Sequence, residues 1–550
     1  MTGAEPARTP AAGREAVERV GQSIRSGDMA GARRLAIEAL AAGVEHPLLL
    51  NLRALQHEDD GRFEASLADL QRAHLLAPND FAILNACGLA LGRLERIEEA
   101  VSCFDQASAL EPRFTPAWFN RGWALERLGE TAKAAQSYAK AAELKPDHVQ
   151  AWASLAWLAA RRGDAEAARL SADRALALQP GQPTAILALA SVEVAQAPRI
   201  AEERLRALLA SQDLGPFDRA LAFGQLGDAL DALDQPSEAF AAYSQSNAIF
   251  RDEARARFEA PGQETAAGSL TWMTRWAEDL DERRWRSSDA DRTAEAGERG
   301  HVFLIGFPRS GTTLIESVLA AHPDVVSLEE RNTLDAAVRA FVGDTRSLSM
   351  LGQANGRDLA PHRADYWRRV KSYGVDPAGK IFIDKNPFNT PKLPVIYKLF
   401  PNAKIIFAVR DPRDVVLSCF RRRFSLNAST YELLDLGRAA AFYDATMRFA
   451  EIMRSRQNLP EHVLVYERLT QDFEAEAKAV CAFIGADWRP ELADFAGRAR
   501  RGDVASASSA QIARGLYADG AGQWRRYAAE LAPILGVLAP WVERFGYPSQ

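Results

Sequence analysis

The chain has 550 residues, more than one hydrophobic core supports, so two or more domains are expected. Its 47% hydrophobic and 25% charged residues are typical of a globular protein, and its net charge of −6 argues against a nucleic-acid-binding chain. Four cysteines without a CxxC pair, an N-terminus without the apolar core of a signal peptide, and no apolar run of about 18 residues predict a cytoplasmic protein without disulfides, zinc or a membrane span.

A 34-residue repeat occupies the first part of the chain. Its clearest markers are prolines that recur at this interval: Pro78, Pro112, Pro146 and Pro180. Between them, apolar residues at helical spacing predict two helices per repeat, joined at a glycine (Glu95 in one repeat) and ended by the proline. One hairpin cannot bury its apolar face alone, so neighbours must stack. We expect an α-helical solenoid over residues 13–250, with its best repeats at 46–182.

This pattern resembles the tetratricopeptide repeat. The resemblance implies a concave groove that binds a peptide or a partner protein. The alternative is that the repeats only support the neighbouring domain. Looser copies of the repeat at 183–250 leave the number of terminal repeats open.

The periodicity changes after a polar linker, residues 251–300, which contains a predicted helix around LTWMTRWAEDL. Over residues 301–550, five short β-rich segments alternate with helical ones: HVFLIGF, VVSL, KIFID, AKIIFAV and HVLVY. Alternating strands and helices predict an α/β domain whose parallel sheet is covered on both faces. Ligands of such sheets bind at the carboxyl ends of the strands.

The segment GFPRSGTT, residues 306–313, has the spacing of a phosphate-binding loop between a predicted strand and a predicted helix. Glycines let the backbone approach an anion, and free N–H groups with the helix dipole stabilise its charge. Thr312 stands where triphosphate-binding loops have lysine. The loss of that charge indicates a less charged group at this end of the ligand, such as a phosphosulfate, with Arg309 as the cation.

PRSGTTLIESVLAAHPDV resembles the 5′-phosphosulfate loop of sulfotransferases that use 3′-phosphoadenosine 5′-phosphosulfate (PAPS), above all the tyrosylprotein sulfotransferase branch. VRDPRDVVLS resembles the segment of that family in which an arginine and a serine eight residues later bind the 3′-phosphate. Over residues 300–550 the resemblance implies PAPS as donor, no metal, and these donor-binding residues: Arg309, Ser310, Gly311, Thr312, Thr313, Arg410, Ser418, Tyr466 and Ser508, with Arg422 as a weaker addition. Gln523 stands where the family often has a basic residue before Trp524, and Arg525 or Arg514 would have to substitute for it.

Three residues are the candidates for the chemistry itself. The resemblance implies that Lys385, at the end of a predicted strand, contacts the bridging oxygen of the donor, and Arg309 adds positive charge. It also implies that Glu330 is the base. Its neighbour Glu329 is the less favoured choice, because adjacent residues of an extended chain face opposite ways. His322 is a rival base, but its place at a helix end before a proline is typical of a capping residue.

These observations predict transfer of a sulfuryl group to an acceptor hydroxyl, with the repeats recruiting the acceptor or a partner. A peptide tyrosine is favoured slightly, and carbohydrate, lipid head group and small-molecule acceptors stay open. One alternative is a kinase with a divergent loop, in which Asp411 would hold Mg²⁺. The other is a catalytically inactive scaffold.

Overall fold

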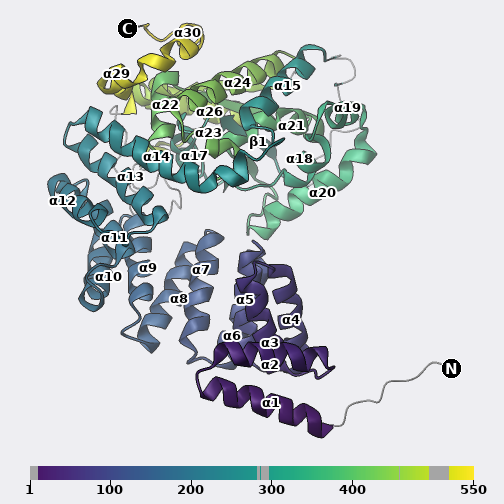
Figure 1. Ribbon diagram of the computed structural model, residues 1–550. Coiled ribbons are helices and arrows are strands. Elements are labelled where there is room, and N and C mark those ends of the chain that lie inside the picture. The colour runs from purple at the N-terminus through teal and green to yellow at the C-terminus, as the bar shows by residue number, and fades with distance from the viewer. Residues whose placement is uncertain (1–9, 281–284, 286–295, 457–458, 495–519, 550) are drawn as a thin grey trace. The chain divides into compact units, whose positions relative to one another are not determined.

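The computed structural model describes residues 10–280, 285, 296–456, 459–494 and 520–549. These residues fall into two compact units that divide close to residue 190. The first unit is entirely helical, and the second contains a parallel β-sheet with helices on both faces (Figure 1). The predicted combination of an α-helical repeat solenoid with an α/β domain is therefore confirmed.

The first eight helices of the first unit pair consecutively as hairpins (Figure 1). The helices are α1 (Pro10–Arg25), α2 (Met29–Ala41), α3 (Pro47–Asp59), α4 (Phe63–Leu76), α5 (Phe81–Arg93), α6 (Ile97–Leu110), α7 (Thr115–Arg127), α8 (Thr131–Leu144), α9 (Val149–Arg161), α10 (Ala165–Leu178) and α11 (Pro183–Glu193), the last of which crosses the division. At the turn within a hairpin the chain adopts a left-handed conformation, with φ of 78° at Gly129 and 59° at Glu95. Glycine suits this turn because it has no Cβ, and Glu95 adopts the same conformation at some cost in strain.

A glycine in the first helix of a hairpin lies against an aromatic ring of the second. A Cβ added to Gly122 would lie 2.7 Å from the ring of Tyr138, and one added to Gly88 would lie 2.5 Å from that of Phe104. Each glycine therefore lets the two helices approach closely over a buried ring. The aromatic residue follows the glycine by 16 positions in both hairpins.

The second unit begins with further helices: α12 (Pro198–Leu209), α13 (Pro216–Ala232), α14 (Pro236–Phe258) and α15 (Ala266–Glu278). The pair α13–α14 repeats the packing of the first unit, because a Cβ on Gly227 would lie 2.5 Å from the ring of Tyr243, 16 positions later. Asp234 occupies the turn with φ of 59°. The hairpin α13–α14 therefore has the geometry of a repeat, although it belongs to the same compact unit as the sheet.

Five parallel strands form the sheet in the order β2-β3-β1-β4-β5. They are β1 (Gly300–Gly306), β2 (Val325–Glu329), β3 (Ile381–Lys385), β4 (Lys404–Val409) and β5 (Glu461–Val465). Each corresponds to one of the β-rich segments of the sequence. Because β1 pairs with both β3 and β4, the loop that follows β1 lies between the carboxyl ends of those two strands.

Helices and short 3₁₀ segments connect and cover these strands. They are α17 (Thr312–Leu319), α18 (Asp335–Phe341), α19 (Thr345–Gln353), α20 (Gly356–Ser372), η2 (Pro387–Lys392), α21 (Leu393–Leu399), α22 (Pro412–Phe420), α23 (Ala428–Glu432), α24 (Leu436–Ser455), α25 (Tyr466–Gln471), α26 (Phe473–Ile484), η3 (Pro490–Asp494), η5 (Gln523–Tyr527), α29 (Ala528–Leu531), η6 (Ala532–Ile534) and α30 (Leu535–Arg544).

The two faces of the sheet bury different side chains. Aliphatic residues such as Leu304 and Ile383 pack with residues of α17 and α26 on one face. Aromatic residues pack on the other, where the ring of Phe303 lies 6.2 Å from that of Tyr366 in α20. Because side chains alternate along β3, Lys385 lies on the aliphatic face together with Ile383. Asp384 lies on the aromatic face.

Substitution of Gly122 by alanine tests the close approach of the repeat helices. The new Cβ would overlap the ring of Tyr138, so Gly122→Ala should lower the free energy of unfolding by about 1–3 kcal/mol. Gly21→Ala is the control, since its Cβ would lie 3.5 Å from Arg25, an ordinary contact, and alanine is the better helix former. Urea unfolding followed by circular dichroism measures both. Equal stability of the two variants would contradict this packing.

Candidate active site

The loop of residues 306–311 begins and ends with a glycine, and neither position has room for a side chain. A Cβ on Gly306 would overlap the carbonyl oxygen of Ala408, and one on Gly311 would lie 2.6 Å from Cδ2 of Tyr466. Gly311 precedes α17 with φ of 94°, and Arg309 has φ of 70°, which is unusual for a residue with a side chain. A strained conformation of this kind persists only where neighbouring groups hold it.

Two residues of the segment 410–418 hold Arg309. Its Nε donates to Oγ of Ser418 at 3.0 Å, and its carbonyl oxygen accepts from Nη1 of Arg410 at 3.0 Å. Arg410 also donates to the carbonyl of Gly520, and its guanidinium lies 4.7 Å from the ring centroid of Tyr466. The predicted residues of the loop, of the segment that starts at Arg410, and of the segment that starts at Tyr466 thus meet at the carboxyl ends of β1, β4 and β5.

This cluster, Arg309–Arg410–Ser418, is rich in positive charge and holds unused polar atoms. Burial, together with the charges of Arg422 and Arg410, lowers the pKa of Arg309. Among the described residues, the buried Oγ of Ser310 and Nε of Arg410 have no hydrogen-bond partner. Buried polar atoms rarely remain unpaired, so a hydrogen-bonding ligand is expected here. Converging guanidinium groups favour an anionic one.

A second cluster surrounds Lys385, whose side chain is fully buried. Its Nζ lies 2.8 Å from Glu330 Oε1, 3.1 Å from Glu329 Oε1 and 3.3 Å from Glu316 Oε2. Burial alone would lower the pKa of Lys385, but these three carboxylates raise it above its ordinary value. Lys385 is therefore a protonated cation inside the protein.

The carboxylates of the Lys385 cluster differ in their surroundings. The side chain of Glu316 is 7% exposed, and burial raises its pKa to about 7, against the opposing effect of Lys385. Glu330 is half exposed, which leaves its carboxylate accessible to a substrate. Its φ of 46° is left-handed, and its N–H donates to the carbonyl of Lys385 at 2.7 Å. This hydrogen bond fixes the strained residue beside the lysine.

Helix α17 links the two clusters. Thr312 and Thr313 form its first turn directly after the loop, and Glu316, one turn later, contacts Lys385. The 3₁₀ segment η2 supports the loop from the other side, because Oγ1 of Thr390 bonds both the N–H and the carbonyl of Gly306. Both clusters therefore lie at the same edge of the sheet.

A buried network supports Lys385 from the aromatic face. Asp384 accepts hydrogen bonds from Thr333 Oγ1 at 2.8 Å and from the hydroxyl of Tyr366 at 2.9 Å. Asn389 of η2 donates to its other oxygen at 3.3 Å. Burial raises the pKa of Asp384 to about 6. Since Thr333 follows Glu330 by three residues, Asp384 ties the Glu330 segment to β3.

Other residues singled out by the sequence lie elsewhere. Nδ1 of His322 accepts from the N–H of Asp324 at 3.1 Å, just before β2 begins, whereas Glu329 is at the opposite end of that strand. Both carboxylate oxygens of Asp411 accept from Arg413, at 3.0 and 2.8 Å, which leaves Asp411 poorly placed to hold Mg²⁺. Ser508 and Arg514 lie outside the described residues.

The segment around Gln523, where the resemblance led us to expect a basic residue, packs on α22, the helix that carries Ser418 of the Arg309–Arg410–Ser418 cluster. The N–H groups of Gly522 and Trp524 donate to Asp414 in α22 at 2.6 and 2.8 Å. Gln523 therefore lies close to α22, and exposed Arg525 has its guanidinium 5.1 Å from the ring centroid of Trp524.

Sequence reasoning missed Glu316 and Asp414, which anchor Lys385 and the 522–524 segment. The available signal was an acidic residue inside a short apolar helix, in TTLIESVL for the first and PRDVVLSCF for the second. Such a residue is rarely buried without a partner.

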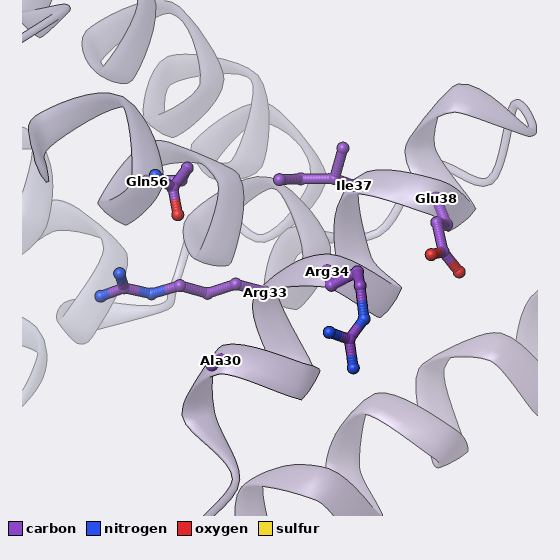
Figure 2. A pocket seen from close by; sticks show the side chains of 6 residues that line it. All are labelled: Ala30, Arg33, Arg34, Ile37, Glu38 and Gln56. Atoms are coloured by element: carbon purple, nitrogen blue, oxygen red, sulfur yellow. The ribbon is translucent and has the colours of Figure 1, made fainter. Parts of the chain in front are cut away.

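A pocket of about 310 Å³ lies in the first unit, against α2, and carries none of these residues. Its lining, which Figure 2 shows from close by, consists of Ala30, Arg33, Arg34, Ile37, Glu38 and Gln56. Across the described ranges, no group of three or more His, Cys, Asp or Glu side chains is arranged to hold a metal ion.

Residues 301–490 match the sequence model of the sulfotransferase family, and residues 86–148 and 133–183 match that of the tetratricopeptide repeat. The second unit contains a domain of the sulfotransferase family. Protein-tyrosine sulfotransferase 1 of Danio rerio is 28% identical over 264 residues, which cover 45% of this chain and 72% of that protein.

Two further proteins are similar to parts of this chain. An uncharacterized protein of Aquifex aeolicus (strain VF5) is 26% identical over 270 residues, 46% of this chain, and the match spans only 34% of that longer relative. A tetratricopeptide repeat protein from Parabacteroides merdae ATCC 43184 superposes with a TM-score of 0.33 and 18% identity, covering 38% of this chain and 86% of its own.

Throughout the ranges that the structure describes, no helix has both the length and the apolar character to cross a membrane.

Removal of the Lys385 charge should make the stability of the sulfotransferase domain fall more steeply with pH. The folded state already raises the pKa of Glu316 from 4.5 to about 7, so ionisation of Glu316 destabilises the fold as the pH rises through this window. In Lys385→Met the buried carboxylate loses its cation, and its pKa rises further. The variant should lose about 3–5 kcal/mol at about pH 8, and less at about pH 5.

Urea unfolding of Lys385→Met at both pH values measures this effect. The control is Lys385→Met combined with Glu316→Gln, which removes the buried charge and should recover most of the stability at the higher pH. A loss that is independent of pH, or that the second substitution does not relieve, would contradict the charge pairing.

Proposed function

We propose that this protein transfers a sulfuryl group from PAPS to the hydroxyl of an acceptor molecule. The observation that carries the proposal is the meeting, at one edge of the sheet, of the Arg309–Arg410–Ser418 cluster with the Lys385–Glu330 pair. In the first cluster, Arg410 and Ser418 suit a phosphate that binds without reacting, and Arg309 lies next to them. The Lys385–Glu330 pair offers a cation and an accessible carboxylate next to each other. The sulfotransferase-family match over residues 301–490 supports the same reaction.

The donor-binding roles are those that the family resemblance implies, and the charges and unpaired polar atoms of the Arg309–Arg410–Ser418 cluster support them. Arg410 and Ser418 are proposed to bind the 3′-phosphate, with Tyr466 next to the nucleotide. The loop from Arg309 to Thr313, with its unpaired Ser310 hydroxyl, is proposed to bind the 5′-phosphosulfate. Ser508 remains a prediction from the family resemblance.

In the proposed reaction the acceptor oxygen attacks sulfur, and a new O–S bond forms as the S–O bond to the 5′-phosphate breaks. Glu330 takes the proton of the acceptor hydroxyl, and the electron pair of the broken bond stays on the phosphate oxygen. Adenosine 3′,5′-bisphosphate and a sulfated acceptor are the products. Lys385 and Arg309 are proposed to stabilise the negative charge of the departing phosphate, as preorganised cations do in group transfer.

Glu330 is proposed as the base in preference to Glu329 because its side chain is the more exposed, at 50% against 28%. The 2.8 Å contact between Glu330 and Lys385 also supports the pairing of a base and a cation at the transferred group.

A peptide tyrosine is the proposed acceptor, by analogy with the relative named protein-tyrosine sulfotransferase 1. In this proposal residues 13–250 recruit the acceptor or a partner, and residues 301–550 catalyse the transfer. Residues 251–300 connect these two parts of the chain. The cytoplasm is the proposed compartment, which fits four cysteines that are free thiols.

The donor is tested by ligand-dependent melting of the full chain. Adenosine 3′,5′-bisphosphate should raise the melting temperature without added metal, because a ligand that binds only the folded state stabilises it. ATP with Mg²⁺ should raise it much less. Equal or greater protection by ATP with Mg²⁺ would favour the kinase alternative.

Two substitutions separate donor binding from chemistry. Arg410→Ala should weaken bisphosphate binding by about tenfold to a hundredfold, the cost of a lost charge-assisted contact. Glu330→Gln removes only basicity, so it should leave that affinity almost unchanged and lower the single-turnover rate by about 10²–10⁴. Calorimetric titration and single-turnover transfer measure the two effects. Full turnover by Glu330→Gln, with loss of turnover in the matched variant Glu329→Gln, would reassign the base.

A further inference from the structure

The repeat hairpin α13–α14 packs against the end of α22. This helix carries Ser418 of the Arg309–Arg410–Ser418 cluster, which we call the donor cluster. The side-chain amide of Asn247, 3% exposed, donates to the carbonyl of Phe420 at 2.9 Å and so caps the last turn of α22. The ring of Phe240 stacks on that of Phe420 with centroids 5.1 Å apart. A helix that carries Ser418 is therefore completed by side chains of the repeat hairpin.

Three consecutive arginines follow Phe420, and the hairpin binds the outer two. Arg421 forms an ion pair with Asp231, and Arg423 forms one with Asp228 at 2.5 Å. Across the residues that the structure describes, Arg422 forms no ion pair, although it lies between these two.

Arg422 lies in the turn directly after α22, four positions after Ser418 of the donor cluster. Its N–H donates to the carbonyl of Cys419 at 3.1 Å, which keeps it close to the last turn of that helix. Ser418 contacts Arg309, and the charge of Arg422 is, after burial, the first influence that lowers the pKa of Arg309. The unpaired charge of the three thus lies beside the donor cluster.

The space left by a glycine of α13 is a separate indication that the Arg423–Asp228 ion pair matters. A Cβ on Gly224 of α13 would lie 2.6 Å from Cδ of Arg423 and 3.1 Å from Oγ of Ser246. Glycine is a poor helix former, yet here it leaves the space through which Arg423 reaches Asp228.

We propose that hairpin α13–α14 is a positioning element of the donor site. Asp228 and Asp231 hold Arg423 and Arg421, and thereby direct Arg422 at the 3′-phosphate. This inference rests on the proposed function, since it assumes an anionic group at that point. Three adjacent arginines repel one another, and the two aspartates neutralise the outer charges while leaving the middle one for the ligand. The hairpin then supports the donor-binding residues, and its contacts are a condition of donor binding.

The test uses the full chain and two probes, adenosine 3′,5′-bisphosphate and adenosine 5′-monophosphate, in calorimetric titrations. Asp228→Asn should weaken binding of the bisphosphate by about tenfold, the scale of a lost charge-assisted contact, and leave the monophosphate within about threefold. Asp234→Asn is the matched control, because Asp234 is 87% exposed and pairs with Arg526 instead. It should change neither affinity.

A second substitution distinguishes loss of the Arg423–Asp228 contact from unfolding of the protein. Gly224→Ala should reproduce the selective loss by displacing Arg423 while the far-ultraviolet dichroism stays unchanged. Gly536→Ala in α30, where a Cβ meets nothing within 4 Å, should have no effect. In an Arg422→Ala background, Asp228→Asn should cause no further loss, because two residues that act through one contact are not additive.

The outcomes separate the two proposals. If wild type prefers the bisphosphate and Asp228→Asn and Gly224→Ala keep that preference, the positioning role is wrong. An equal loss for both probes would also overturn it, since that result describes a scaffold. If wild type itself binds the two probes equally, the proposed donor is wrong.

Discussion

A fully buried ammonium group cannot persist in a protein core unless anions surround it, and Lys385 imposes that condition on this domain. Its three carboxylates come from α17 and from the end of β2, while the lysine itself ends β3. The ion cluster therefore joins three elements at the carboxyl edge of the sheet. The loop after β1 and the Glu330 segment depend on this junction, because α17 begins at the first and β2 leads into the second.

The same edge concentrates strained backbone. Arg309 and Glu330 both adopt left-handed conformations that side chains disfavour. The carbonyl of Arg309 accepts a hydrogen bond from Arg410, and the N–H of Glu330 donates one to the carbonyl of Lys385, each at the end of a neighbouring strand. Strain of this kind costs of order 1–3 kcal/mol per residue and is retained where the surrounding structure fixes it. The sheet supplies that rigidity, because β1, β3 and β4 are consecutive neighbours.

The repeats show how one packing device serves two purposes. The pairs Gly88–Phe104, Gly122–Tyr138 and Gly227–Tyr243 all place a ring against a glycine of the partner helix. In the first unit the resulting hairpins stack on other hairpins. In α13–α14 the same hairpin packs instead on the sulfotransferase domain, and acidic residues near the end of α13 pair with arginines of the segments after α22 and in η5.

Local patterns in the sequence determined the elements and the chemistry of individual loops. The 34-residue period identifies the repeats, and short β-rich runs between helical segments identify the five strands, because both are set by neighbouring residues. The loop GFPRSGTT, the interval from Arg410 to Ser418 and the position of Lys385 at a strand end are also local. Only the tertiary structure decided which distant groups converge. The contacts of Glu316 with Lys385, and of Asp228 and Asp231 with Arg423 and Arg421, join residues far apart in the chain. No short-range pattern encodes such pairs, since burial and charge balance select them only once the strands and helices have packed.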